Sequence, residues 1–283
     1  MSSQVMFQAI AGFRLVTADL ERLTSFYRAI GFVTADTAPI AVSEMMTLGL
    51  TGAGLRRPMA LRGSRIDLDS FDERGSSYPE GATACDLVFQ HLALVTDDAH
   101  AAWQRARAAG ATPITRGEPV TLPASSGGVT AMKFRDPDGH PLELLSFPPG
   151  AHPPWRSNGA AGIDHSAISI ADIAASQRFY EECGLALGKR TLNQGPAQAA
   201  LDDLDGVEVD VLPMNPAHNT PHIELLGYRH PAGRPYGAMA LNDVAATRIV
   251  CFSNREAVVH DPDGHLLQLI RKDQSPEDIS SRR

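Results

Sequence analysis

Two histidines and two glutamates combine residue types and a repeated spacing that could support metal chemistry. His91 and His165 each open an apolar stretch typical of a strand, and each is followed by a glutamate in a later strand, Glu143 after 52 residues and Glu224 after 59. Imidazole and carboxylate groups together suit Zn, Ni, Co, Mn or Fe(II). A lone histidine at the start of a strand is more often a hydrogen-bonded core residue, and a strand glutamate can simply pair with an arginine. The repetition at equivalent positions favours a role as metal ligands.

Glu143 is predicted to face the interior. It lies between Leu142 and Leu144, and because alternate residues of a strand share a face, Leu145 lies on the same face as Glu143. A carboxylate with apolar neighbours needs a charged partner or a metal ion.

The string Asp-Pro-Asp-Gly-His occurs twice, at 136–140 and at 261–265, each time inside a strand–turn–strand pattern. Proline presets φ at the second position of a tight turn, Asp bonds its own backbone, and Gly tolerates the backbone conformation at the end of the turn. We therefore expect a hairpin at each copy, with His140 and His265 shaping the turn.

A second repeat predicts three helices. Each of its three copies consists of a strand, an Asp, an amphipathic stretch, and a Gly twelve residues after the Asp. Asp is a preferred N-cap residue and Gly a preferred residue just beyond a helix, so each stretch is well bounded. The bounding pairs are Asp19 and Gly31, Asp98 and Gly110, and Asp172 and Gly184.

Together the repeats predict an α+β protein of four β-α-β-β-β modules. The fourth module is truncated, because Asn254 leads almost directly into the last hairpin and leaves no room for a helix. The modules cover residues 6–69, 89–147, 162–228 and 244–270.

The modules group along the chain into two stretches, 6–147 and 162–271. Residues 148–161 are rich in Pro and Gly and are predicted to be a linker, and residues 272–283 form a polar tail.

Composition excludes several classes of function. The formal net charge is −8 and the pI about 5.7, which argues against nucleic-acid binding because such binding rests on neutralising phosphates. No stretch approaches about 20 consecutive apolar residues, so we expect no membrane span. The N-terminus lacks the pattern of a signal peptide, and the three cysteines are scattered. We therefore expect a cytoplasmic protein.

The opening of each helical module and the closing hairpin resemble a known family. A strand and helix with the pair Phe26-Tyr27 or Phe179-Tyr180 and a following Gly, closed by DPDGHPLEL, are similar to the vicinal oxygen chelate (VOC) superfamily. That superfamily includes glyoxalase I, extradiol ring-cleaving dioxygenases, methylmalonyl-CoA epimerase and the bleomycin-resistance proteins. The resemblance covers nearly the whole chain and implies two open barrels, each made of two modules, with metal ligands on the first and last strand of each module.

The family pattern maps onto the modules by counting. The first-strand position, seven residues before the helix Asp, is Gly12, His91 and His165 in modules one to three. The fourth module has no helix Asp to count from, and Thr247 is taken as a first guess. The last-strand position gives Asp67, Glu143, Glu224 and Gln268.

Two pairings of modules are open. If modules pair in order, each barrel has an incomplete set of ligands. If module two pairs with three and one with four, one barrel collects His91, Glu143, His165 and Glu224, a set similar to the two-His, two-Glu site of some glyoxalases I. We favour the second pairing, because modules one and four both lack the set.

The resemblance implies a metal-dependent enzyme of the glyoxalase type. It would be an isomerase or lyase that acts on a small substrate with vicinal oxygens through a metal-chelated enediolate. Its cofactor would be a divalent metal (Fe, Ni, Zn, Mn or Co), held by His91, Glu143, His165 and Glu224. Either glutamate could serve as the catalytic base, and we favour Glu224. The alternatives are an Fe(II) extradiol-type dioxygenase and a metal-free binding protein resembling the bleomycin-resistance proteins.

Three further residues are candidates for contact with substrate: His222, Tyr228 and Trp155. No glutathione-binding arginines are identifiable, so the substrate need not be a glutathione adduct. The expected partner is a small molecule, with no nucleic acid and no membrane. One chain already supplies two barrels, so either a monomer or a homodimer fits the sequence.

Overall fold

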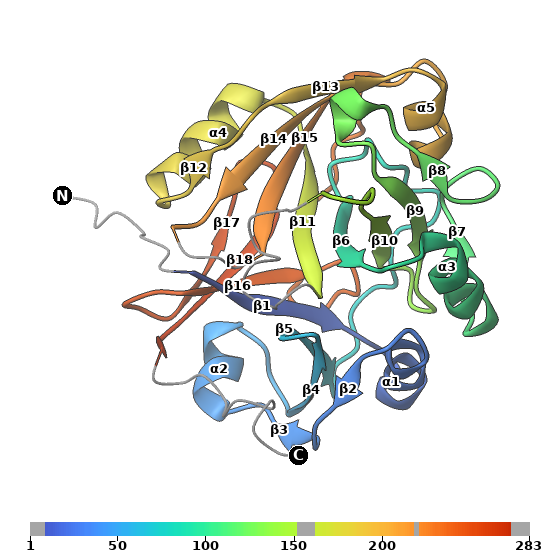
Figure 1. Cartoon of the computed structure of the whole chain (residues 1–283). Helices are drawn as coiled ribbons and strands as arrows, with labels where there is room; N and C mark the ends of the chain where they lie inside the picture. The colour runs from blue at the N-terminus through green and yellow to red at the C-terminus, as the bar shows by residue number, and fades with distance from the viewer. Residues whose placement is uncertain (1–8, 152–161, 218–220, 273–283) are drawn as a thin grey trace.

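The computed structural model describes residues 9–151, 162–217 and 221–272. Two strongly curved open sheets, surrounded by helices, make up the fold (Figure 1). The prediction of an α+β fold built from four modules is confirmed.

The larger sheet joins modules two and three. Its two central strands, β6 and β11, run antiparallel, and each is flanked by the last strand of its own module in parallel orientation. The order is β12-β14-β15-β11-β6-β10-β9-β7, with β13 on β14 and β8 on β9. Its strands are β6 (Gln90–Val95), β7 (Thr112–Pro113), β8 (Val120–Thr121), β9 (Thr130–Arg135), β10 (Pro141–Ser146), β11 (Ile163–Ile170), β12 (Ala186–Leu187), β13 (Thr191–Gln194), β14 (Glu208–Asn215) and β15 (His222–His230).

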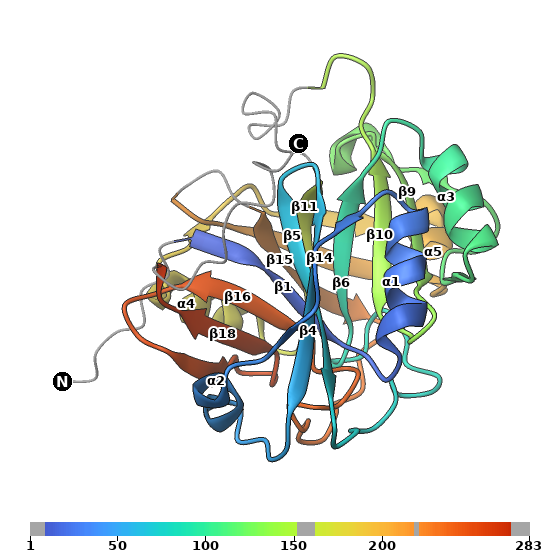
Figure 2. The same cartoon turned by 90° about the horizontal axis from the view of Figure 1, so that it is seen from below.

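The smaller sheet joins modules one and four in the same way. Its central strands β1 and β16 run antiparallel, and β5 and β18 flank them in parallel (Figure 2). The order is β17-β18-β16-β1-β5-β4-β2, with β3 on β4. Its strands are β1 (Ala9–Val16), β2 (Val33–Thr34), β3 (Ala38–Pro39), β4 (Gly54–Leu61), β5 (Ser64–Phe71), β16 (Arg248–Phe252), β17 (Ala257–His260) and β18 (Leu266–Ile270).

The three predicted helices are confirmed, together with their caps. In α1 (Leu20–Ala29), α3 (Ala99–Ala108) and α4 (Ile173–Glu182), the preceding Asp accepts hydrogen bonds from backbone N–H groups of the first turn. The glycine beyond each helix has φ between 96° and 109°, a conformation that few other residues adopt. Module four contains no helix between β16 and β17, as predicted.

Both predicted hairpins form, and each also binds the helix of the preceding module. Asp136 accepts from the backbone N–H of His140, and Asp261 does the same for His265. The Tyr27 hydroxyl on α1 donates to Asp136 at 3.1 Å, and Tyr180 on α4 repeats this bond to Asp261. Module one is thus joined to module two, and module three to module four, at these turns, although the strands of each pair lie in different sheets.

Two short helices were not predicted: α2 (Val42–Thr47) and α5 (Pro196–Asp202). A single 3-10 turn, η1 (Ala124–Ser126), also precedes β9. Within the described ranges, no helix is long and apolar enough to cross a membrane. Most of the predicted linker, residues 152–161, and the tail from 273 lie outside the described residues.

Candidate metal centre and its cavity

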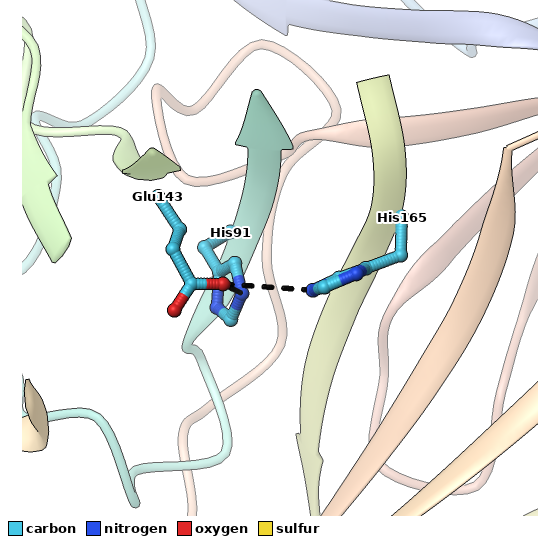
Figure 3. A group of neighbouring side chains, drawn as sticks. All are labelled: His91, Glu143 and His165. Atoms are coloured by element: carbon cyan, nitrogen blue, oxygen red, sulfur yellow. Dashed lines mark ion pairs between the residues drawn. The ribbon is translucent and has the colours of Figure 1, made fainter. Parts of the chain in front are cut away.

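The two central strands of the larger sheet bring His91 and His165 together. His91 on β6 lies opposite Ala167 of β11, and His165 lies opposite Ala93 of β6, so both imidazoles project from one face of the sheet. Their ring centroids are 5.5 Å apart. Glu143 reaches the same place from β10, which pairs with β6 on its other side (Figure 3).

The ligand atoms converge closely. Nε2 of His91 is 3.2 Å from Oε2 of Glu143, and Nε2 of His165 is 3.7 Å from the same oxygen. One atom from each of the three residues lies within 4.8 Å of the other two, which makes the group capable of holding a metal ion. Glu224 on β15 adds a second carboxylate, with Oε2 3.5 Å from Nε2 of His165.

The hydrogen-bonding pattern leaves imidazole nitrogens at the centre without partners among the described residues. Both ring nitrogens of His91 and Nε2 of His165 are buried without a hydrogen-bond partner among the described residues, a costly arrangement for polar atoms. Nδ1 of His165 lies 2.8 Å from Oδ2 of Asp164. Because a carboxylate only accepts, Nδ1 carries a proton, and Nε2 is the nitrogen that can bind a cation once its own proton has been lost. The residues therefore fit a divalent metal.

Charge and burial act differently on the two histidines. Burial lowers the pKa of His91, despite the opposing effect of Glu143, so this imidazole is neutral at pH 7. Burial also opposes a charge on His165, but Glu224 and Asp164 outweigh it and raise the pKa of His165 to about 9.

Both carboxylates stay ionised. Burial by itself would raise the pKa of Glu143, but His91 and Lys133 hold it below the usual value. Burial likewise opposes ionisation of Glu224, yet His165 and His222 lower its pKa to about 2. The side chain of Glu224 is 20% exposed and that of Glu143 6% exposed, so Glu224 is the more accessible of the two.

Of the three predicted substrate contacts, the structure places two beside the centre. Nε2 of His222 lies 3.4 Å from Oε1 of Glu224, and Asp164, His165 and His222 form a second group of possible ligands. Tyr228 lines the adjacent cavity. Trp155 lies outside the described residues.

This cavity, of about 260 Å³, opens beside the proposed ligands. Its walls are largely apolar and include Leu122, Val129, Leu145, Val211 and Leu226. Lys133 and Lys189 supply the cationic side chains among the described residues that line it.

Sequence reasoning missed Lys133, Gln198 and Asp202. Lys133 stands alone between Met132 and Phe134 in a buried strand, a pattern that indicates an inward charge needing a partner. That partner is Asp202, whose carboxylate lies 2.6 Å from Nζ of Lys133. Asp202 belongs to α5, and no sequence pattern predicted this helix.

The smaller sheet has different residues at the equivalent positions. In the larger sheet Ala167 pairs with Glu224, and in the smaller sheet Val250 pairs with Gln268. His165 lies two residues before Ala167, and Arg248 lies two residues before Val250, so Arg248 is the counterpart of His165. The guess of Thr247 was wrong by one residue, because this module has no helix from which to count.

Gly12 occupies the place of His91, and no side chain fits there. A Cβ atom on Gly12 would lie 2.7 Å from the carbonyl oxygen of Arg65. Arg248 is fully buried, and its Nη2 lies 2.7 Å from Asp69. A fixed cation therefore takes the place of a ligand, and arginine–carboxylate pairs fill this part of the sheet.

Comparison with known proteins agrees with this architecture. The sequence of residues 9–144 matches the model of the Glyoxalase/Bleomycin resistance protein/Dioxygenase superfamily. Over this stretch the sequence is similar to that superfamily. No match is found among curated proteins.

The fold resembles a solved member over nearly the whole chain. Glyoxalase I from Zea mays aligns with a TM-score of 0.60 and 15% identity, covering 93% of this chain and 92% of that one. A mutant of the same maize protein aligns with a TM-score of 0.61 and 14% identity, covering 93% of each chain. At these identities the likeness concerns the fold.

Proposed function

We propose that this protein is a metal-dependent enzyme of the glyoxalase type, an isomerase or lyase acting on a small substrate with two neighbouring oxygens. One observation carries the proposal: two buried imidazoles and the Glu143 carboxylate converge from two modules at the wall of a cavity, with Glu224 3.5 Å from His165. The likeness in fold to glyoxalase I supports the same reading.

His91, Glu143, His165 and Glu224 would hold the ion. This set of two imidazoles and two carboxylates suits Fe, Ni, Zn, Mn or Co. When bound, such an ion acts as a Lewis acid that polarises substrate oxygens and stabilises the negative charge that develops on them.

Glu224 is the proposed base, and it takes a proton from the carbon next to the substrate carbonyl onto a carboxylate oxygen. It is the more exposed of the two glutamates, and His222 contacts its other oxygen. Among the influences that lower the pKa of Glu224, His165 is the largest.

The first test is the metal content of protein purified without added metal. We expect a stoichiometric divalent metal in the wild type and its loss in both His91→Ala and His165→Ala. His100→Ala, on an exposed face of α3, is the matched control and should keep the metal. Retention of wild-type metal content by either of the first two variants would contradict a shared site.

The second test follows proton removal directly. Deuterium from D₂O should enter dihydroxyacetone at the carbon next to the carbonyl, and chelation of the metal should stop this exchange. Glu224→Gln should lose the exchange but keep the metal, because the compact group of His91, Glu143 and His165 remains. Glu143→Gln breaks that group and should lose both. Exchange that persists without metal counts against the proposal, and a protein that never takes up metal points to a metal-free binding role.

An Fe(II) extradiol-type dioxygenase is the second candidate. The observation that favours it is that His91, Glu143 and His165 form a compact group without Glu224, and two histidines with one carboxylate are the ligands of non-haem Fe(II) oxygenases. Oxygen consumption by the Fe(II)-loaded protein with catechol, together with a ring-cleaved product, would decide in its favour.

A further inference from the structure

The short helix α5 closes one end of the cavity. In the sequence it lies between β13 and β14 of module three. In space it packs against β13 and also against β8 and β9 of module two (Figure 1). The Thr115 hydroxyl donates to the carbonyl of Leu201 at 3.0 Å, and the backbone N–H of Arg116 donates to the carbonyl of Ala200 at 2.9 Å. These bonds hold α5 in place, and Gln198 lines the cavity from it.

Asp202 organises the polar groups at this end. Its Oδ1 accepts from Nζ of Lys133 at 2.6 Å, and its Oδ2 accepts from Nε2 of Gln198 at 2.8 Å and from the Tyr228 hydroxyl at 3.1 Å. A carboxylate offers no proton, so the amide of Gln198 must turn its N–H group toward Asp202. The orientation of Gln198 is thereby set, with its carbonyl oxygen on the opposite side.

That carbonyl oxygen has no hydrogen-bond partner among the residues that the structure describes. Gln198 is only 4% exposed, and its Oε1 is buried without a hydrogen bond to any described residue. Leaving a buried acceptor unpaired is costly, so a donor from a bound molecule would be favoured at this point.

The smaller sheet offers an internal comparison. Glu44 is the third residue of α2, as Gln198 is the third of α5, and each helix lies between the corresponding strands of its module. Arg56 donates to both carboxylate oxygens of Glu44, at 2.8 and 2.7 Å, and Gln268 donates to one of them at 2.8 Å. There the chain itself supplies the donors, whereas at Gln198 the described part of the chain supplies none.

The polar cluster adjoins the proposed metal ligands. Burial opposes the charge on Lys133, but Asp202 and then Glu143 raise the pKa of its ammonium group. Burial and Asp202 raise the pKa of Tyr228, and Glu143 adds to the effect. Gln198 and the four proposed ligands line the same cavity, so a small molecule held there can reach from the centre to Gln198.

We propose that Gln198 is a specificity-determining residue whose Oε1 accepts a hydrogen bond from a hydroxyl or N–H group of the substrate, while the vicinal oxygens of the same molecule lie at the metal centre. The inference rests on the proposed function. It defines the substrate as a compact molecule with vicinal oxygens at one end, an apolar body that fits walls such as Leu122 and Val129, and one neutral donor. The ammonium of Lys133 is already engaged by Asp202, so the substrate needs no anionic group there.

The test uses matched catechols as probes with Co(II)-loaded protein. A hydroxymethyl and an ethyl substituent have nearly the same size, but only the first carries a donor, and both are tested at ring positions 3 and 4. Calorimetry should show that the wild type prefers one hydroxymethyl isomer over its ethyl counterpart by about tenfold. In Gln198→Met the preference should vanish, while the Kd of unsubstituted catechol and the Co(II) content stay unchanged. Gln194→Met, on the exposed part of β13, is the control and should keep the preference.

The outcomes separate this inference from the proposed function. If the protein binds Co(II) and catechol but the wild type favours no hydroxymethyl isomer, or if Gln198→Met keeps the preference, the subsite is wrong and the metal site stands. If the protein takes up no metal, the proposed function fails. The same probe pairs are then titrated into the metal-free protein by ligand-observed NMR, where a preference that depends on Gln198 supports the subsite and equal binding overturns it.

Discussion

Metal binding at pH 7 should release one proton, and it should come from His165. The pKa of His165 is raised to about 9, whereas burial keeps that of His91 below its usual value. The pKa values of Glu143 and Glu224 are both lowered, so neither carboxyl group holds a proton at neutral pH. Because a ligand nitrogen must be unprotonated, only His165 among these four residues has a proton to lose.

The size of the effect is set by that pKa. A group with a pKa near 9 is protonated in about 99 of 100 molecules at pH 7, so release should be about one proton at pH 7 and about half a proton at pH 9. The apparent metal affinity should rise about tenfold per pH unit between pH 6 and 8, or about 2.7 kcal/mol over the two units.

Calorimetric titration of the metal-free protein with Co(II) measures the release. Repeating it in two buffers with different heats of ionisation gives the number of protons from the difference in apparent enthalpy. His100→Gln should release the same number as the wild type. Release of two protons at pH 7, or of none, would refute the assignment of the proton to His165.

Further predictions concern stability. Asp69→Asn should cost about 3–5 kcal/mol in the free energy of unfolding, measured with urea, because it leaves the buried guanidinium groups of Arg56 and Arg248 without their shared carboxylate. Arg248→Met should cost less, because Asp69 keeps its two bonds to Arg56. Burial opposes ionisation of Asp69, but Arg56 and Arg248 hold its pKa well below the usual value. The stability that this ion pair contributes is therefore present above about pH 4 and is lost as the pH falls further. Urea unfolding at pH 3 and pH 6 measures this loss, which should be smaller in Asp69→Asn than in the wild type. Tyr27→Phe removes the hydroxyl bond to Asp136, and thermal unfolding should show a cost of about 1 kcal/mol with no change in metal content.

The sequence by itself determined the local parts of this structure. Asp19, Asp98 and Asp172 cap helices, and the two Asp-Pro-Asp-Gly-His strings form hairpins, because each of these features depends on hydrogen bonds within a few residues. The inward direction of Glu143 also followed from the alternation of residues in a strand.

Only the tertiary structure decided what these parts meet. His91 and His165 are neighbours because β6 pairs with β11, and pairing between strands of different modules leaves no mark in either segment alone. The same holds for Arg248. The pairing register of the strands identifies it as the counterpart of His165, which counting residues along the sequence did not. Gln198 became a candidate only when α5 was seen to pack across two modules, because contacts between distant segments depend on surfaces that form after the strands have paired.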